Sequence, residues 1–197
     1  MKKNYFPNSS LELLNQLLKL TFSIFLFFLF TISLQAQVDF TGNASINFTG
    51  YTGAGFAPMP GAGQLDSDNW AITGFSDGAS DYGDTNNLGD FARGSTPGGV
   101  STGGLYNLSN ASNDIFWIQP GGSDFTPGTI TLRLNNNTGA AINNLDIAYD
   151  IFFLNDEERS NSLNFSYSID NITYNSISIL DFNTPEASDV LGVQSES

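Results

Sequence analysis

The sequence predicts an all-β fold, a two-sheet antiparallel β-sandwich of the jelly-roll kind, and two observations support this prediction. Residues 129–174 contain three runs in which apolar and polar residues alternate with a period of two. A strand sends successive side chains to opposite faces, so each run gives one apolar and one polar face. After residue 36, no stretch shows the apolar period of a helix over three turns. Strands that each bury one face need a second sheet to cover it.

The first 36 residues differ from the remainder and predict a helical signal peptide. Lys2, Lys3 and Lys19 are the only lysines in the chain, and they precede an apolar run from Leu20 to Leu34. This run is shorter than the roughly 20 residues that a membrane-spanning helix needs. Small Ala36 supplies a cleavage position, which completes the pattern of a secretory signal. The alternative is an uncleaved N-terminal anchor.

We therefore expect a signal peptide in residues 1–36 and a β-sandwich module in residues 37–197. The protein would be secreted or exposed at the cell surface, with no membrane contact after cleavage of the signal. Without cysteine, the module has no disulfide, so burial of apolar surface must stabilise it.

The charge of residues 37–197 disfavours some partners and some kinds of catalysis. Arg93, Arg133 and Arg159 face nineteen acids, which leaves a net charge of −16. Such a charge repels the backbones of nucleic acids and anionic membrane surfaces. This part of the chain also has no His, Cys or Lys, so the usual Ser–His and Cys–His nucleophile pairs cannot form. Carboxylate chemistry and calcium binding remain possible.

The first predicted strands lie before residue 76. Alternation predicts a strand over residues 38–48, and the Gly- and Pro-rich stretch 50–63 predicts a loop. In the next strand, Trp70 and Ile72 point to one face, and Gly74 marks a bulge.

A long polar stretch over residues 76–104 is rich in glycine and acids, and loops of this length are uncommon unless they have a function or are disordered. Residues 105–108 and 115–119 then predict a hairpin. Three further strands follow in the alternating runs, and Asp170 and Asn171 predict a two-residue turn because both tolerate positive φ. Residues 177–183 predict a last strand.

Two acids that flank a glycosidic bond could hydrolyse it. Asp146 and Asp150 share one strand face but lie about 13 Å apart along the strand, which is too far for an acid and nucleophile pair. Asp156, Glu157 and Glu158 sit in the following loop. We interpret all five as solvated surface acids, and expect Arg159 to pair locally in that loop.

Calcium is the metal that the acid-rich loops would favour, because it prefers hard oxygen ligands. The candidate ligands do not match the spacing of an EF-hand loop, so acids without a metal are the alternative. No organic cofactor is expected. The candidates are Asp66, Asp68, Asp77, Asp81 and Asp84, with Asp90 beyond them.

Aromatic rings on a sheet face or loop tip could form a platform for sugars. The candidates are Trp70, Tyr82 and Tyr106, with Tyr51 and Trp117 as further rings outside the central strands. An aromatic residue in a strand more often belongs to the core, so core packing is the alternative for each. Arg133 lies among Thr131 and Asn135, where we interpret it as a solvated edge charge or as the partner of an acid.

Several phrases resemble an N-terminal module of secreted Bacteroidetes proteins. They are QLDSDNWAITGFSDG, GDFARGSTPGGVSTGGLY, IQPGGSDFTPGTITLRLNNNTG, LDIAYDIFFLNDEERSNSLNFSYSIDN and LDFNTPEASD. The resemblance covers residues 40–189. It implies a jelly-roll sandwich that precedes lamin-tail domains, endonuclease/exonuclease/phosphatase domains and a type IX sorting tag. It carries over no catalytic residue. The usual module continues with further strands after TPEASD, which implies a truncated chain.

These observations favour a non-catalytic secreted module that binds glycans or acts in adhesion, within a larger secreted protein. The alternative is the N-terminal part of a secreted nuclease or phosphatase whose catalytic domain is absent. A stand-alone glycan hydrolase that uses the acids above is a third hypothesis.

Overall fold

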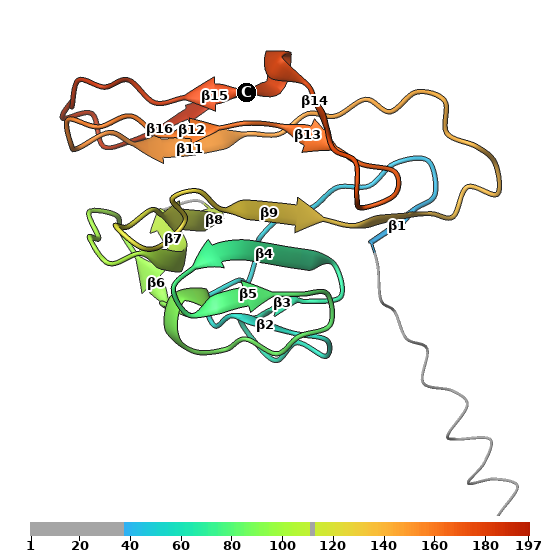
Figure 1. The fold of residues 1–197 in the computed structure, drawn as a ribbon. Helices are drawn as coiled ribbons and strands as arrows, with labels where there is room; N and C mark the ends of the chain where they lie inside the picture. Colours follow the sequence, from blue (N-terminus) through green and yellow to red (C-terminus); the bar gives the residue numbers. More distant parts are fainter. Residues whose placement is uncertain (1–37, 111–112) are drawn as a thin grey trace, which may run out of the picture. The chain divides into compact units, whose positions relative to one another are not determined.

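The computed structural model describes residues 38–110 and 113–197, and the predicted signal peptide lies outside them. The described residues form sixteen strands and two three-residue 3₁₀ helices, which confirms the predicted all-β class (Figure 1). Among the residues described, no helix has the length and apolar character needed to cross a membrane.

The elements follow one another with short strands throughout. The strands up to residue 119 are β1 (Val38–Phe40), β2 (Phe56–Ala57), β3 (Leu65–Asp66), β4 (Trp70–Phe75), β5 (Gly78–Ser80), β6 (Ser95–Thr96), β7 (Gly104–Asn110) and β8 (Asn113–Gln119). The later strands are β9 (Thr129–Leu132), β10 (Leu134–Asn136), β11 (Ile151–Leu154), β12 (Ser162–Leu163), β13 (Ser166–Tyr167), β14 (Asn175–Ser176), β15 (Phe182–Asn183) and β16 (Val193–Glu196). The 3₁₀ helices are η1 (Gly89–Phe91) and η2 (Ser178–Leu180).

These strands form seven small sheets. Two have three strands, in the orders β5–β4–β9 and β6–β7–β8. The first is antiparallel throughout, whereas β6 runs parallel to β7 in the second. The other strands pair in twos: β1–β10 and β2–β3 are parallel, and β11–β16, β12–β15 and β13–β14 are antiparallel.

The hairpin of β7 and β8 is the best-packed element of the described chain, and it confirms the hairpin predicted around residues 105–119. It is buried on both faces. Leu105, Phe116 and Ile118 contribute to a core cluster with side chains of β2, β4, η1 and β9, such as Ile72. The next residue in β7, Tyr106, belongs to a second cluster on the opposite face.

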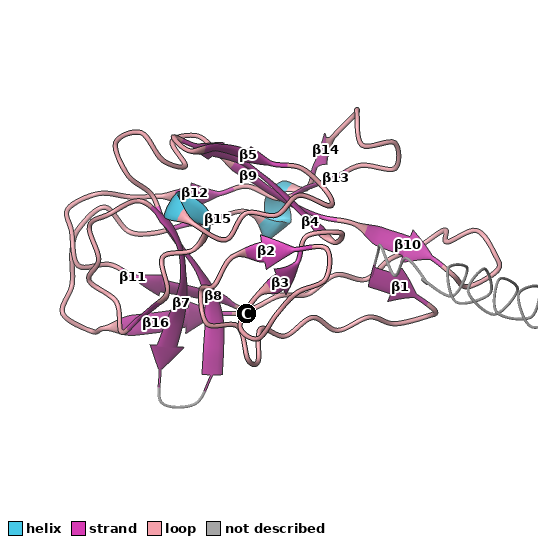
Figure 2. Cartoon of the chain, turned by 90° about the horizontal axis from the view of Figure 1, so that it is seen from below, coloured by secondary structure: helices cyan, strands magenta, loops and turns pink. Residues whose placement is uncertain are grey.

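That second cluster joins the hairpin to β11 and β16. Leu108 is fully buried, and Phe152, Leu154 and Val193 pack against the cluster. Figure 2 shows β11 and β16 crossing β7 and β8 in projection. The hairpin can be buried on both sides because apolar residues occupy successive positions in both of its strands.

Strand β4 shows the predicted alternation and the predicted irregularity. Ile72 is fully buried, whereas Thr73 on the other face is exposed. The register between β4 and β5 shifts between Ile72 and Phe75, which confirms the bulge at Gly74. Gly74 has a φ of 97°, a conformation that favours glycine.

The C-terminal half differs from the predictions in several places. Strand β11 begins only at Ile151, and the preceding residues pair with no strand. Phe152 and Leu154 face the second cluster, although the alternation favoured Ile151 and Phe153 as the buried set. Four successive apolar residues give no signal about which face is buried, so alternation could not settle it.

Two shorter predictions in this half were wrong. The turn between β13 and β14 spans residues 168–174, because Tyr167 is opposite Asn175. Asn171 has the predicted positive φ, at 58°. Residues 178–180 form η2 instead of continuing a strand, and only residues 182–183 pair, with β12.

Candidate functional site

Tyr82 and Arg133 form the most distinctive contact of a charged group with a ring. The Arg133 guanidinium lies 4.2 Å from the centroid of the Tyr82 ring. Arg133 also donates from Nη2 to the carbonyl of Asp68 at 2.7 Å, and its backbone N–H donates to the carbonyl of Asn69 at 2.9 Å. Stacking of a guanidinium on an aromatic face is favourable and fixes the planes of both groups.

Backbone bonds hold Tyr82 in a tight turn after β5. The Asp81 N–H donates to Asp84 Oδ2 at 2.9 Å, and the Asp84 N–H donates to the Asp81 carbonyl at 3.1 Å. The Gly83 N–H donates to the Ser67 carbonyl at 3.1 Å, which ties the turn to the β3–β4 connection. Tyr82 therefore projects from a preorganised corner and not from a free loop.

A second tyrosine comes to this corner from the β13–β14 turn. Tyr174 is 46% exposed, and its hydroxyl donates to Asn171 Oδ1 at 2.7 Å. Asp170 accepts hydrogen bonds from the N–H groups of Ile172 and Thr173, at 2.9 and 2.8 Å. These two bonds lower the pKa of Asp170 to about 2, so the turn that carries Tyr174 is held by an ionised carboxylate.

The pKa of Tyr82 reports how these groups surround its hydroxyl. Burial raises this pKa, the nearby Tyr174 raises it further, and the cation of Arg133 lowers it. Tyr82 is therefore a neutral hydrogen-bonding group near neutral pH. We name Tyr82, Arg133, Tyr174 and Asn171 the tyrosine corner. All four border the same open space on the described chain.

The three predicted sugar-platform residues occupy different environments. Tyr82 lies in the tyrosine corner. Trp70 is half-buried and packs against the first core cluster, with its ring 5.9 Å from that of Phe116. Tyr106 is only 6% exposed and donates its hydroxyl to the carbonyl of Thr102 at 2.9 Å. The structure therefore does not bring the three rings together, and core packing accounts for Tyr106.

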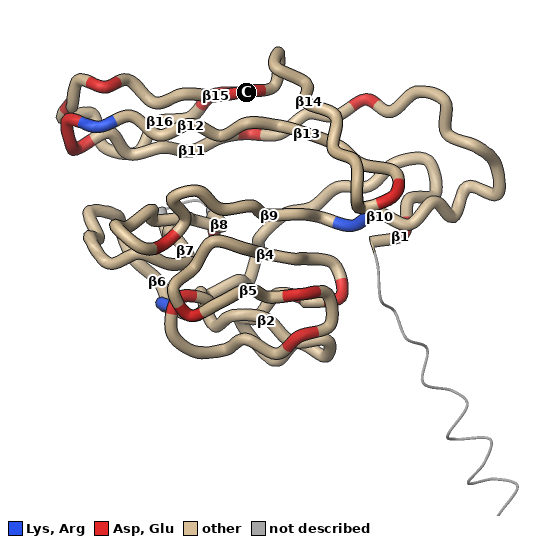
Figure 3. The backbone as a smooth tube through the Cα atoms, in the orientation of Figure 1, with Lys and Arg blue, Asp and Glu red and all other residues tan. Residues whose placement is uncertain are grey.

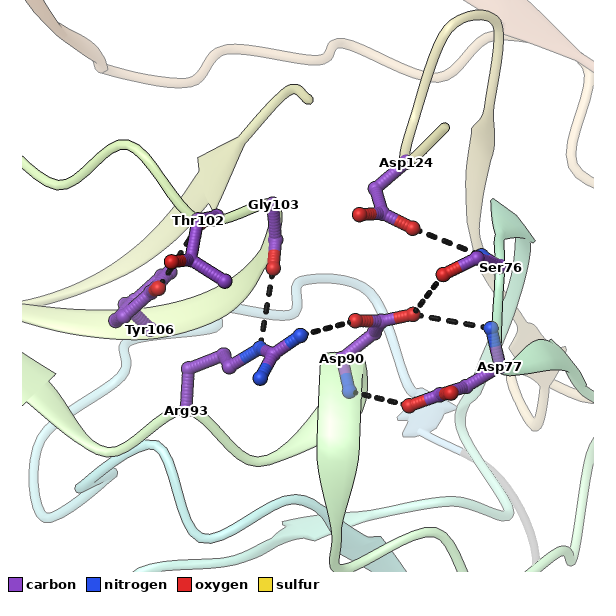
Figure 4. Close-up of polar contacts among 8 residues, drawn as sticks. All are labelled: Ser76, Asp77, Asp90, Arg93, Thr102, Gly103, Tyr106 and Asp124. Atoms are coloured by element: carbon purple, nitrogen blue, oxygen red, sulfur yellow. Dashed lines mark hydrogen bonds and ion pairs between the residues drawn. The ribbon is translucent and has the colours of Figure 1, made fainter. Parts of the chain in front are cut away.

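The densest polar cluster surrounds Asp90 (Figure 4). Asp90 is 1% exposed and forms an ion pair with Arg93 through Oδ1. Its Oδ2 accepts from the Ser76 hydroxyl at 3.1 Å and from the Asp77 N–H at 3.0 Å. Asp77 returns a bond, because its Oδ2 accepts from the Asp90 N–H at 2.9 Å.

Two further groups complete this Asp90 cluster. Arg93 Nε donates to the carbonyl of Gly103 at 3.0 Å, and Asp124 Oδ1 accepts from the Ser76 N–H at 2.8 Å. The bond from Ser76 lowers the pKa of Asp124, with smaller contributions that include Arg93. Both oxygens of Asp90 are used by the protein itself, so the cluster connects η1, the β4–β5 turn and the start of β7. A catalytic acid needs an oxygen that can reach a substrate, and Asp90 offers none.

The candidate calcium ligands are dispersed over three turns. Asp66 Oδ1 accepts from the Asp68 N–H at 2.9 Å, and burial raises the pKa of Asp66. Asp81 and Asp84 cap their own turn, and Asp77 belongs to the Asp90 cluster. Among the described residues, no group of three acids is arranged to hold a metal ion.

The acids considered for glycoside hydrolysis lie at the surface. Asp146, Asp150, Asp156 and Glu158 are exposed. Glu157 is also exposed and lies 3.6 Å from Arg159, which agrees with the local pairing expected for that arginine.

Sequence reasoning missed two members of the tyrosine corner. Arg133 was interpreted as an edge charge, because alternation shows on which face a residue lies but not which ring it meets. Tyr174 was not considered, although it follows the Asp170–Asn171 turn and such positions are exposed. Comparison with known proteins adds nothing further, since no protein-family model, curated protein or solved structure matches the chain.

Proposed function

We propose that residues 37–197 form a secreted, non-catalytic recognition module that binds neutral glycans at the tyrosine corner. The supporting observation is the stack of Arg133 on Tyr82 beside the half-exposed ring of Tyr174. Rings that present an apolar face, next to groups with fixed hydrogen-bonding directions, suit sugars, which have both C–H faces and hydroxyls.

The charge around the corner favours a neutral glycan over an acidic one. Asp68, Asp84 and Asp170 belong to the turns that build it, and they oppose the single cation of Arg133. Acidic positions far outnumber basic ones along the described chain (Figure 3). A polyanionic chain would meet this field as repulsion, whereas carboxylates can accept hydrogen bonds from sugar hydroxyls.

The absence of catalysis is also part of the proposal. Residues 37–197 contain no His, Cys or Lys, and the most buried carboxylate, Asp90, is fully occupied by the protein's own donors. The module is a jelly-roll sandwich in this proposal, with the two-faced β7–β8 hairpin between the first core cluster and β11–β16 in support. The resemblance to the N-terminal modules of secreted Bacteroidetes proteins stays a prediction.

A panel of neutral and acidic oligosaccharides tests the proposal. We expect the chain to bind a neutral member, and Tyr82→Ala and Tyr174→Ala each to weaken that binding at least about tenfold, as for a central interface residue.

Tyr167→Ala is the matched control. Tyr167 is equally exposed, at 46%, but lies on the other face of the β13–β14 hairpin because it is opposite Asn175. An affinity that both corner variants leave unchanged, or a panel without any binding, would refute the proposal.

A further inference from the structure

We infer that residues 141–149 are an acceptor strand, which pairs with an extended segment of a basic partner protein. This inference concerns a different surface from the tyrosine corner and does not depend on glycan binding.

The backbone of residues 141–149 is extended but unpaired. These residues contain no turn or bend, and all except half-buried Tyr149 are exposed. Within residues 38–110 and 113–197, no backbone–backbone hydrogen bond involves them. The chain becomes a paired strand only at Ile151, which is opposite Glu196 of β16. A row of free N–H and C=O groups is a template for another strand.

The side chains of the segment have the pattern of a strand. Leu145, Ile147 and Tyr149 alternate with Asp146 and Ala148. Leu145 is 45% exposed and Ile147 38%, which is unusual for apolar residues with this period. An added strand would cover part of this apolar surface and satisfy the backbone groups at the same time.

The space beside the segment has the size for a polypeptide. Leu145, Ile147 and Tyr149 border an open cavity of about 3670 Å³, which Leu163 and Phe165 also line. Small-molecule sites measure roughly 300–1,000 Å³, so this space exceeds what one small ligand fills.

Charge identifies the partner as basic. Asp146 and Asp150 belong to or follow the segment, Glu196 lies at its junction with β16, and the β11–β12 loop adds three acids. The nearby Arg159 already pairs with Glu157. A second copy of this chain would bring the same acidic surface, so a partner with Lys or Arg around its strand is the complementary choice.

The probe is a synthetic peptide in which valine alternates with lysine, and its counterpart alternates valine with glutamate. We expect the lysine peptide to bind the full chain at least tenfold more tightly in a fluorescence anisotropy titration. The double variant Asp146→Lys, Asp150→Lys should reverse this preference.

Two proline variants test the pairing itself. Neighbouring residues of a strand direct their N–H groups to opposite edges, so Ile147→Pro and Ala148→Pro each remove a donor from a different edge. We expect one of them to weaken peptide binding at least tenfold and the other to have little effect. Neither should lower the unfolding temperature, because no intramolecular backbone bond is lost.

Equal affinities for the two peptides, no binding of either, or no effect of either proline would overturn the inference. A dimer mass for the chain alone in light scattering would also overturn it, since a second copy would then be the occupant.

Discussion

Leu108 offers the sharpest test of the two-faced hairpin. Leu105 and Leu108 are both fully buried in β7, but Leu105 contributes to the first core cluster and Leu108 to the second. Truncation of a buried leucine to alanine costs about 2–5 kcal/mol of stability. We expect both Leu105→Ala and Leu108→Ala to fall in this range.

The contacts of Leu108 explain why its cost should be large. A methyl group built on Gly98 would lie 3.0 Å from Leu154 Cδ2 and 3.7 Å from Leu108 Cδ1, so the two leucines converge on Gly98. Their double variant should deviate from additivity by about 0.5–3 kcal/mol, as contacting residues do.

Guanidinium unfolding followed by the fluorescence of Trp70 and Trp117 measures these free energies. Leu88→Ala is the control, because Leu88 is 79% exposed and its truncation should change stability by less than about 0.5 kcal/mol. If Leu108→Ala behaved like this control, the second face of the hairpin would be open to solvent and the packing of β11–β16 on it would be wrong.

Three further predictions concern the Asp90 cluster and the β13–β14 turn. Asp90→Ala should lower stability by about 3–5 kcal/mol in urea unfolding, because it leaves Arg93 without its buried partner. Gly104→Ala should cost more than about 1 kcal/mol in the same assay, because φ is 136° and the added methyl would lie 2.8 Å from the Asp90 carbonyl. The lowered pKa of Asp170 means that the turn is stabilised above the usual carboxyl pKa and loses this stabilisation as pH falls toward 2. An NMR titration of Asp170 with a midpoint near 4 would contradict this last prediction.

The elements that sequence reasoning predicted well are those with clear local signals. Residues 105–119 place apolar side chains on both strands around a polar turn, and the β7–β8 hairpin follows. The bulge at Gly74 was predictable because a lone glycine interrupts an alternating strand.

Other features depend on contacts between distant residues. The run Ile151–Leu154 is apolar on both faces, so only the tertiary contacts of Phe152 and Leu154 show which side the second cluster buries. Tyr82 and Arg133 lie far apart in the sequence, and nothing local indicates that the guanidinium covers the ring. Periodicity predicts faces of strands, but it does not predict which strands become neighbours.

The most direct test of the proposed function is the NMR footprint of a bound neutral oligosaccharide on the chain. We predict shift changes centred on Tyr82, Arg133, Asn171 and Tyr174. Shift changes centred on residues 141–154 instead, with the tyrosine corner unaffected, would contradict the account.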